Sequence, residues 1–425
     1  MEYLALPRAR RVEGAVRVPP SKSATNRALV LAAISGRPVE IVRPLESGDT
    51  NALLQCLRAM GARVGAAPEG FSLGGPLCGN PSEEIALDAA ESGTAARFLA
   101  ALAAVTPGRF RLDGSARLRE RPMAELIEAL RRAGAEIRCL GKEGFLPLSI
   151  TGSALRPSAP VVVDAERSSQ FFSALLLAGA AVEGGLAVRP AGGVASRPYV
   201  EATIETLTAF GHTVRREADG IAVFRGRSET SRYEVPGDDS SAVPILAAVG
   251  VVGGRVAALG IRAGSRAADV RALTVLEQMG IAFEPLPDGV GASYGGGPLR
   301  PVRVEAADFP DSVPVLAALA ALAEGESRFD GIGHLRYKES DRLASLVALV
   351  AAAGGTARAE AAALVVVGGI SRGALAILPT CGDHRVAMAA ALVAIARGDC
   401  LIENPDCVAK SYPDFFRDLT ARLRF

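Results

Sequence analysis

The chain has 425 residues, of which 49% are hydrophobic and 22% are charged. This length exceeds what one hydrophobic core usually supports and predicts two domains. Lys and Arg total 47 against 46 Asp and Glu, so no overall field attracts nucleic acid or an anionic membrane surface. Any affinity for anions must therefore come from basic side chains that are grouped locally.

The predicted elements begin with short strands at 3–19 and continue with an Ala-, Leu- and Val-rich helix at 28–34. This helix is apolar nearly all round, which is typical of a buried helix, and its alanines allow close packing. Segments of the same kind recur at intervals of about 70 residues. They lie at 98–104, 174–178, 243–249, 315–321 and 387–393. The chain is therefore predicted to contain six repeats, each built around one buried helix.

A second, amphipathic helix is predicted in each repeat, as in the segment Leu57-Arg-Ala-Met-Gly61. In the first five repeats this helix ends at a glycine, which suits the left-handed conformation of a helix terminus. These glycines are Gly61, Gly134, Gly211, Gly280 and Gly354. Each repeat is predicted to run from buried helix to strand, amphipathic helix and strand pair. The sixth repeat stops where its glycine would fall.

Three repeats per domain divide the chain at Pro19-Pro20 and near Pro236-Gly237, both turn-forming stretches. One domain is predicted at 21–236 and the other at 1–20 plus 237–425. The strands at 3–19 are expected to complete the sixth repeat, so that both chain ends share a domain. A cleft between the domains is the expected ligand site.

Basic and hydroxyl side chains gather where the helices begin, as in Ser21-Lys22-Ser23 with Arg27. The first turn of a helix exposes unpaired N–H groups and a partial positive charge, so it favours anions. Basic side chains in that place are unfavourable for the helix dipole, and a bound polyanion would compensate for them. The sequence therefore predicts a site for phosphorylated metabolites.

Two carboxylates stand among these cations. Asp311 is placed at the start of a buried helix, and Glu339 lies between Lys338 and Arg342. Acids beside anion-binding cations suit proton transfer. The alternatives are a helix cap for Asp311 and an ion pair for Glu339. Residues 238–240, at the corresponding place in the fourth repeat, are interpreted as capping and hinge residues.

The six cysteines form no C-x-x-C pair, which is typical of reduced thiols in a cytosolic protein. The N-terminus has no secretory signal pattern, and the apolar segments are shorter than the ~20 residues of a membrane-spanning helix. With three histidines and no cluster of ligands, no metal site is predicted. We expect a cytoplasmic protein that binds neither nucleic acid nor a membrane.

Seven motifs, in order along the whole chain, resemble those of the 5-enolpyruvylshikimate-3-phosphate synthase family, the enolpyruvyl transferases of the shikimate pathway. The first is Pro19-Pro-Ser-Lys22-Ser23-Ala-Thr-Asn26-Arg27. The others lie at 119–123, 168–171, 196–199, 336–342, 383–388 and 409–415. The resemblance implies a mixed α/β (α+β) fold, a two-domain inside-out α/β barrel. Each domain would hold three βαβαββ repeats, with the active site in the interdomain cleft.

The resemblance also implies the reaction, which is transfer of the enolpyruvyl group of phosphoenolpyruvate to the 5-hydroxyl of shikimate 3-phosphate. Phosphate is released, and the product leads to chorismate and the aromatic amino acids. No metal or organic cofactor is needed, and we expect a monomer. Shikimate 3-phosphate would contact Lys22, Ser23, Arg27, Ser168, Ser169, Gln170, Ser196, Asp311, His334 and Lys338. Phosphoenolpyruvate would contact Lys22, Gly93, Arg121, Gln170, Arg342, Arg385 and Lys410, with support from Arg97.

The expected chemistry passes through a tetrahedral ketal. Protonation of the methylene carbon makes the neighbouring carbon cationic, the hydroxyl attacks it, and the ketal then loses phosphate and a methyl proton. Asp311 is the expected general base on the hydroxyl, and Lys22 and Glu339 are the candidates for moving the carbon proton. Cations around the phosphate would stabilise the leaving group.

The chain departs from the family pattern at Glu91, Phe98 and His334, and Phe98 replaces a frequent Pro. Glu91 stands where the family commonly has Asn-x-Gly-Thr, and His334 stands where an Asn commonly contacts shikimate 3-phosphate. Gly93 favours sensitivity to glyphosate, because an added methyl group there would crowd the inhibitor. We therefore predict sensitivity.

Two other functions would fit parts of the same pattern. UDP-N-acetylglucosamine enolpyruvyl transferases share the fold and chemistry, but they usually have Lys-Asn in place of Lys22-Ser23 and a cysteine in the stretch matching 109–123, where this chain has none. A non-catalytic repeat protein that binds phosphorylated ligands would not need Asp311 and Glu339 among its cations.

Overall fold

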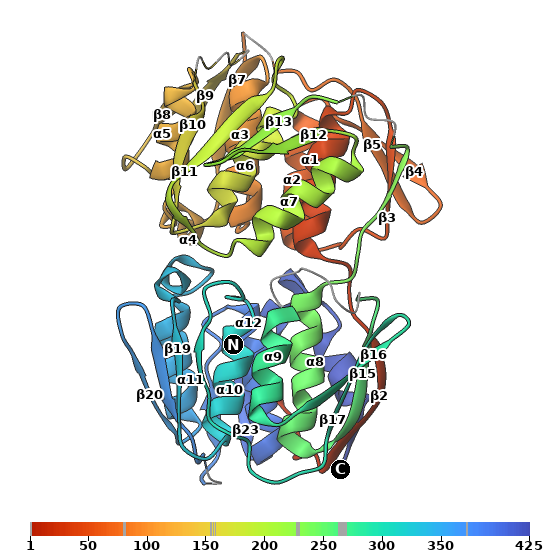
Figure 1. Cartoon of the computed structure of the whole chain (residues 1–425), viewed down its shortest axis with the longest axis vertical. Helices are drawn as coiled ribbons and strands as arrows, with labels where there is room; N and C mark the ends of the chain where they lie inside the picture. Colours follow the sequence, from red (N-terminus) through yellow and green to blue (C-terminus); the bar gives the residue numbers. More distant parts are fainter. Residues whose placement is uncertain are drawn as a thin grey trace. The chain divides into compact units, whose positions relative to one another are not determined.

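A computed structural model describes residues 2–425 except 80–81, 154, 156, 158, 227–229, 262–269 and 371–372. The chain divides into two compact units. The terminal unit contains Met1–Pro19 and Pro236–Phe425, and the middle unit contains Pro20–Val235. The observed divisions lie at 19/20 and 235/236, one residue before the expected divisions at 20/21 and 236/237. Figure 1 marks both chain ends in the terminal unit.

The six predicted buried helices are confirmed. The middle unit contains α1 (Lys22–Ile34), α3 (Gly93–Val105) and α6 (Ser169–Gly179), and the terminal unit contains α8 (Asp239–Val252), α10 (Val313–Leu322) and α12 (His384–Arg397). Most residues of each helix are buried, and the three helices of each unit pack against one another. They therefore form the centre of each core.

The amphipathic helices are also confirmed in the first five repeats. They are α2 (Gly48–Ala59), α5 (Ala124–Arg132), α7 (Pro198–Ala209), α9 (Val270–Met279) and α11 (Arg342–Ala352). Each of the five predicted glycines has a positive φ, between +81° and +115°. Short helices α4 (Ala116–Arg119) and α13 (Phe415–Thr420) and the 3-10 helices η1 (Gly333–Tyr337) and η2 (Pro405–Lys410) complete the set.

The described strands of the middle unit form three four-stranded sheets, ordered β14-β3-β5-β4, β6-β7-β9-β8 and β10-β11-β13-β12. In each sheet the first pair of strands is parallel and the other pairs are antiparallel. The strands are β3 (Val39–Val42), β4 (Arg63–Ala67), β5 (Gly70–Gly74), β6 (Glu84–Asp88), β7 (Gly108–Asp113), β8 (Glu136–Cys139), β9 (Leu148–Gly152), β10 (Val161–Ala165), β11 (Leu186–Val194), β12 (Thr213–Arg216), β13 (Ile221–Phe224) and β14 (Arg232–Glu234).

The terminal unit repeats this pattern in the sheets β16-β17-β15-β2-β24 and β18-β19-β21-β20, and adds the three-stranded sheet β1-β23-β22. Its strands are β1 (Tyr3–Ala5), β2 (Arg11–Arg17), β15 (Gly254–Leu259), β16 (Ala282–Leu286), β17 (Gly289–Tyr294), β18 (Arg303–Glu305), β19 (Glu326–Asp330), β20 (Thr356–Ala359), β21 (Leu364–Val367), β22 (Ala376–Leu378), β23 (Cys400–Glu403) and β24 (Leu423–Arg424). The described strands thus form six separate sheets rather than one closed barrel. The mixed α/β class is confirmed.

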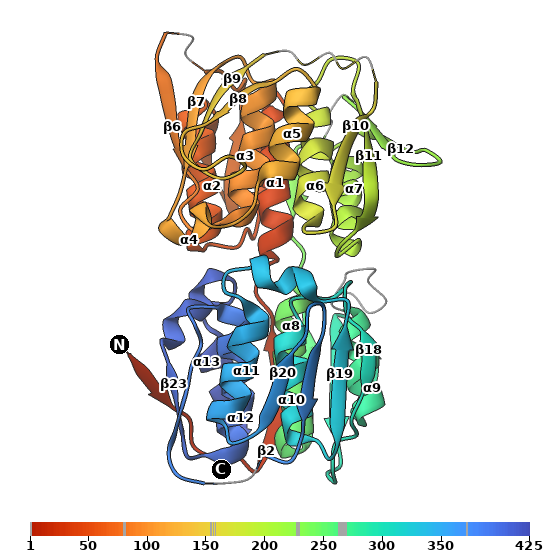
Figure 2. The same cartoon turned by 90° about the vertical axis from the view of Figure 1, so that its left-hand side faces the viewer.

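The prediction that the strands at 3–19 complete the sixth repeat is only partly right. β1 pairs with β23 of the sixth repeat, as expected, but β2 pairs in parallel with β15 of the fourth repeat. Val12 and Val16 on β2 are buried in the core of the terminal unit. β2 thereby occupies the parallel position that the strand before each buried helix takes in the other sheets. Figure 2 shows β2 among the elements of this unit.

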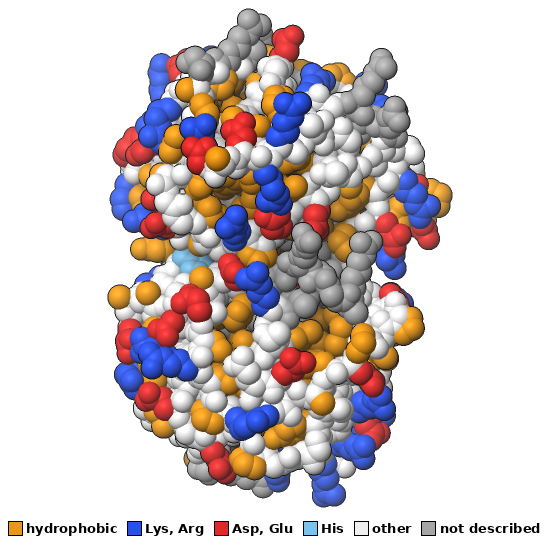
Figure 3. All heavy atoms as spheres, in the orientation of Figure 1, with side chains coloured by type: hydrophobic (Ala, Val, Ile, Leu, Met, Phe, Trp, Pro, Cys, Tyr) orange, Lys and Arg blue, Asp and Glu red, His pale blue; other side chains and the backbone are white. Residues whose placement is uncertain are grey.

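Among the described residues, no helix combines the length and apolar character needed to cross a membrane. On the face drawn in Figure 3, basic and acidic side chains are interspersed over both units rather than gathered into regions of one sign. This matches the near-zero formal charge of the chain.

Candidate active site

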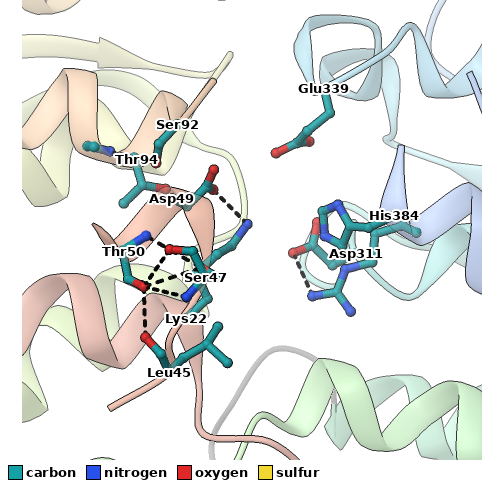
Figure 4. A network of polar contacts seen from close by, with 12 residues as sticks. Lys22, Leu45, Ser47, Asp49, Thr50, Ser92, Thr94, Asp311, Glu339 and His384 are labelled. Carbon is teal, nitrogen blue, oxygen red and sulfur yellow. Dashed lines mark hydrogen bonds and ion pairs between the residues drawn. The ribbon is translucent and has the colours of Figure 1, made fainter. Parts of the chain in front are cut away.

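In the middle unit, Lys22 lies at the start of α1 and forms an ion pair with Asp49. The distance from Lys22 Nζ to Asp49 Oδ2 is 3.1 Å, and both side chains are largely buried. Asp49 lies in the first turn of α2, which a capping box of Ser47 and Thr50 begins. Figure 4 shows Lys22 and Asp49 pointing toward each other. Asp49 is not among the predicted site residues, and its nearest signal in the sequence is the Ser-x-x-Thr cap around it.

Arg27, one turn further along α1, is held by neutral groups. Its Nε donates to Thr203 Oγ1 at 2.7 Å, and its Nη2 donates to the Tyr199 carbonyl at 2.9 Å. Its Nη1 donates to the carbonyl and the hydroxyl of Ser23. Burial lowers the pKa of Arg27 to about 10. The predicted ligands Ser23 and Arg27 therefore lie together and connect α1 to α7.

The starts of α3 and α6 bring a second group of predicted residues together. Arg97 Nη1 donates to Gln170 Oε1 at 3.0 Å, and Gln170 Nε2 donates to Thr94 Oγ1 at 3.0 Å. A Cβ atom added to Gly93 would lie 2.6 Å from the guanidinium carbon of Arg121. Gly93, Arg97, Arg121 and Gln170 thus form one cluster around the beginning of α3. The absence of a side chain at Gly93 makes room for the guanidinium groups.

The serines of the second predicted set lie at the starts of α6 and α7. Ser168 caps α6 by accepting from the Gln170 N–H at 3.2 Å, and Ser169 is the first helical residue. Ser196 lies two residues before α7 with a positive φ of 52°, which is a strained conformation for a residue other than glycine. The helices α6 and α7 pack against each other, so both serine segments belong to the same region.

In the terminal unit, a buried guanidinium connects three carboxylates. Arg342 Nε donates to Asp383 Oδ2 at 2.8 Å, Nη1 donates to Asp311 Oδ1 at 2.7 Å, and Nη2 donates to Glu339 Oε2 at 3.1 Å. Glu339 is thus paired with Arg342, and whether it also moves a proton stays a prediction. The helix-cap alternative for Asp311 is wrong, because Ser312 is the residue that precedes α10. Asp383 is not among the predicted site residues, although it lies in one of the seven motifs, at 383–388.

Electrostatics keeps the carboxylate of Asp311 ionised. Burial alone raises the pKa of Asp311, but three cations lower it well below its usual range. These cations are Arg342, Arg385 and Lys338. Burial lowers the pKa of Arg342, but the surrounding carboxylates raise it well above its usual value. Asp311 is therefore a carboxylate at neutral pH and can accept a proton.

Asp383 also organises the start of α12. It caps this helix by accepting from the Arg385 N–H at 2.9 Å, and it accepts from the Ser340 hydroxyl at 3.2 Å. Arg385 Nη2 lies 3.7 Å from Asp311 Oδ2. His384 Nδ1 lies 3.8 Å from Asp383 Oδ1. The carboxylate of Asp383 thus fixes Arg342 directly and Arg385 through the helix terminus.

His334, Lys338 and Lys410 lie on or directly after the two 3-10 helices of the terminal unit. His334 is buried in η1, and burial together with the charges of Lys338 and Arg342 lowers its pKa to about 3. Its imidazole is therefore neutral at physiological pH. Lys338 follows η1, and Lys410 ends η2, which packs against α12.

The structure thus distributes the predicted residues over the two units. The middle unit contains Lys22, Ser23, Arg27, Gly93, Arg121, Ser168, Ser169, Gln170 and Ser196. The terminal unit contains Asp311, His334, Lys338, Glu339, Arg342, Arg385 and Lys410. Glu91 is exposed in the turn before α3. Within the described ranges, no group of three or more His, Cys, Asp or Glu side chains is arranged to hold a metal ion.

Comparison with known proteins adds independent information. Residues 7–419 match the family model described as EPSP synthase (3-phosphoshikimate 1-carboxyvinyltransferase). A 3-phosphoshikimate 1-carboxyvinyltransferase of Thermococcus kodakarensis is 41% identical over 97% of this chain and 98% of its own. Another, from Methanopyrus kandleri, is 38% identical over 96% of each chain. The solved structure of an EPSP synthase from Acinetobacter baumannii has a TM-score of 0.79 and 25% identity, covering 99% of this chain and 98% of that one.

Proposed function

The chain belongs to the EPSP synthase family, and from this premise we propose that it transfers the enolpyruvyl group of phosphoenolpyruvate to the 5-hydroxyl of shikimate 3-phosphate. The observation that carries the proposal is the pairing of Asp311 with Arg342 at 2.7 Å, with Glu339 bound to the same guanidinium. Binding of anions alone would not require acids in this position. A proton-transfer reaction on an anionic substrate requires both.

Binding of the substrates uses cations in both units. In the middle unit, Arg121 lies against Gly93, and Arg97 is oriented by Gln170. These guanidiniums suit a phosphate or a carboxylate, because their planar donors match its oxygens. Lys22, paired with Asp49, supplies a further donor. The expected interdomain cleft stays a prediction.

Asp311 acts as general base on the 5-hydroxyl. The cations around Asp311 lower its pKa and so weaken it as a base. A phosphate or carboxylate group of the substrate would engage the same cations and offset their positive charge. Binding of the anion therefore raises the pKa of Asp311 and makes it a better base when the acceptor hydroxyl is present.

The remaining steps follow the chemistry of an enol phosphate, which becomes an enol ether in the product. A proton from Lys22 or Glu339 adds to the methylene carbon of phosphoenolpyruvate, and the hydroxyl oxygen forms a bond to the adjacent cationic carbon. In the ketal, the bond to the phosphate oxygen then breaks, phosphate leaves, and a methyl proton is lost to restore the double bond. The guanidiniums stabilise the negative charge of the departing phosphate.

The proposal includes a monomer that acts in the cytoplasm without metal or organic cofactor. Light scattering after size-exclusion chromatography would test the monomer. Unchanged turnover after treatment with a chelator would support the absence of a metal.

The decisive experiment measures phosphate release from phosphoenolpyruvate with and without shikimate 3-phosphate. We expect release only when both are present. UDP-N-acetylglucosamine is the control acceptor, and we expect no release with it. Release that does not depend on shikimate 3-phosphate would overturn the proposal, and release with UDP-N-acetylglucosamine would favour the related transferase.

A further inference from the structure

The start of α8 contacts a cation that is distant in the sequence. Arg385 Nη2 donates to Ser240 Oγ at 2.5 Å, across a separation of 145 residues. Ser240 Oγ lies 2.5 Å from Asp238 Oδ1, and the Ser240 N–H donates to the same oxygen at 3.0 Å. All three side chains are buried, and α8 packs against α12. Asp238, Ser240 and Arg385 therefore form a continuous chain of hydrogen bonds.

The chemistry of the three groups fixes the direction of this chain. A guanidinium only donates, so the Ser240 oxygen accepts from Arg385. The single hydroxyl proton is then available to Asp238, whose ionised carboxylate only accepts. The negative charge of Asp238 thus stabilises the Arg385 cation through the hydroxyl, in two charge-assisted bonds.

A second acceptor competes for the same nitrogen of Arg385. Asp311 Oδ2 lies 3.7 Å from Nη2, further away than the Ser240 hydroxyl. We propose that Ser240 is a positioning residue that holds the Arg385 guanidinium back from Asp311. The inference rests on the proposed function, in which Arg385 binds phosphoenolpyruvate and Asp311 takes the proton of the acceptor hydroxyl.

Helix capping does not account for the Ser240 contact. Asp238 caps α8, as predicted, by accepting from the backbone of Ser240. That cap needs no hydroxyl and no partner on α12. Ser241, the next residue, is also buried, and its hydroxyl has no hydrogen-bond partner within the described part of the chain. The two adjacent serines therefore separate the contact with Arg385 from the general properties of this helix start.

The test compares Ser240→Ala with Ser241→Ala in the full chain. Without the hydroxyl, the guanidinium is expected to move toward Asp311 and to lose its orientation for phosphoenolpyruvate. Removal of a hydrogen bond to a charged group predicts a KM for phosphoenolpyruvate raised about tenfold or more. The KM for shikimate 3-phosphate should rise less than that for phosphoenolpyruvate, because neither Ser240 nor Asp238 is a predicted ligand of shikimate 3-phosphate. Ser241→Ala should leave both KM values and kcat unchanged.

Two further variants keep the test informative if Ser240→Ala proves unstable. Ser240→Thr retains the hydroxyl and should recover most of the affinity for phosphoenolpyruvate. Asp238→Asn retains an oxygen for the helix cap but removes the charge, so the KM for phosphoenolpyruvate should rise by less than in Ser240→Ala. Thermal unfolding of every variant shows whether a change in KM accompanies a loss of folded protein.

The outcomes separate this inference from the proposed function. Wild-type turnover with equal KM values in Ser240→Ala and Ser241→Ala would overturn the positioning role and leave the function standing. A loss shared equally between both substrates would also overturn it, because a structural role alone produces that result. Absence of turnover in the wild-type protein with both substrates would overturn the proposed function itself.

Discussion

Arg27 in the middle unit and Arg342 in the terminal unit are both buried guanidiniums, 2% and 1% exposed. Arg27 donates to hydroxyl and carbonyl oxygens, and burial lowers its pKa to about 10. Arg342 donates to three carboxylates, and these raise its pKa well above the usual value. Burial alone disfavours a charge, whereas carboxylates at hydrogen-bond distance favour it.

The difference suggests a division of labour. A buried cation with neutral partners retains its charge for an anionic ligand. A cation surrounded by acids holds those acids in fixed positions, which suits proton transfer. In the middle unit, Lys22 also has a carboxylate partner, Asp49, and Lys22 is the residue of that unit predicted to move a proton.

The largest expected effect tests this comparison directly, by replacing each guanidinium. Arg342→Met leaves three carboxylates without their common partner, and breaking a buried ion pair in this way is expected to lower the free energy of unfolding by about 3–5 kcal/mol. Arg27→Met removes hydrogen bonds to neutral groups and should lower it by about 1–3 kcal/mol. Urea unfolding of both variants measures the difference. Equal losses of unfolding free energy would contradict the contrast between the two arginines.

Asp311→Asn tests whether the acids serve chemistry rather than binding. The amide keeps the shape of the side chain but cannot act as a base, so kcat should fall by about 10²–10⁴-fold. Binding of phosphoenolpyruvate, measured by calorimetry in the presence of shikimate 3-phosphate, should change far less. Asp308→Asn, in the exposed pair with Arg271, is the control and should keep full turnover. Equal losses of binding and kcat would instead make Asp311 a structural residue.

Gly93→Ala tests the guanidinium cluster of the middle unit. The new methyl group would lie 2.6 Å from the Arg121 guanidinium carbon and would displace it. The KM for phosphoenolpyruvate should rise about tenfold, because the displaced guanidinium would lose a hydrogen bond to the charged substrate, and such a bond contributes about a factor of ten or more to affinity. Inhibition by glyphosate, which we expect in the wild-type protein, should weaken as well.

Gly48→Ala is the matched control for this substitution. Gly48 is also the first residue of a helix after a serine cap, but an added Cβ there would meet nothing within 4 Å. We expect unchanged KM values for this variant. An unchanged KM in Gly93→Ala would show that Arg121 does not bind phosphoenolpyruvate, and unaltered wild-type turnover at millimolar glyphosate would refute the predicted sensitivity.

The last prediction concerns His334, whose pKa is lowered from 6.5 to about 3 in the folded chain. The unfolded chain binds the proton first as the pH falls, so the neutral imidazole contributes stability that is present above about pH 6.5 and lost toward pH 3. In His334→Asn, the free energy of unfolding should fall less steeply across this window, by up to about 1.4 kcal/mol per pH unit. Urea unfolding from pH 7 to pH 4 gives the difference between the two proteins. Parallel curves would show that His334 titrates alike in both states.

Much of the fold could be predicted because its signals are local. The apolar faces of the six buried helices and the glycines that end five amphipathic helices follow from backbone sterics and side-chain periodicity within single segments. The exception is β2, whose partner β15 lies in another repeat. A short strand with alternating apolar residues fits several sheets equally well, and only the packing of the whole unit selects one.

The sequence by itself determined the six repeats, the family and the motifs that hold Asp311, Arg342 and Arg385. Only the tertiary structure decided how these residues are partnered. Asp383 reaches Arg342 across 41 residues, and Ser240 reaches Arg385 across 145. Hydrogen bonds between buried groups depend on which helix starts pack together. The periodicity of the sequence does not predict which helix starts these are. The pKa of Asp311 follows from the same packing, because it is set by cations from two separate segments, 338–342 and the start of α12.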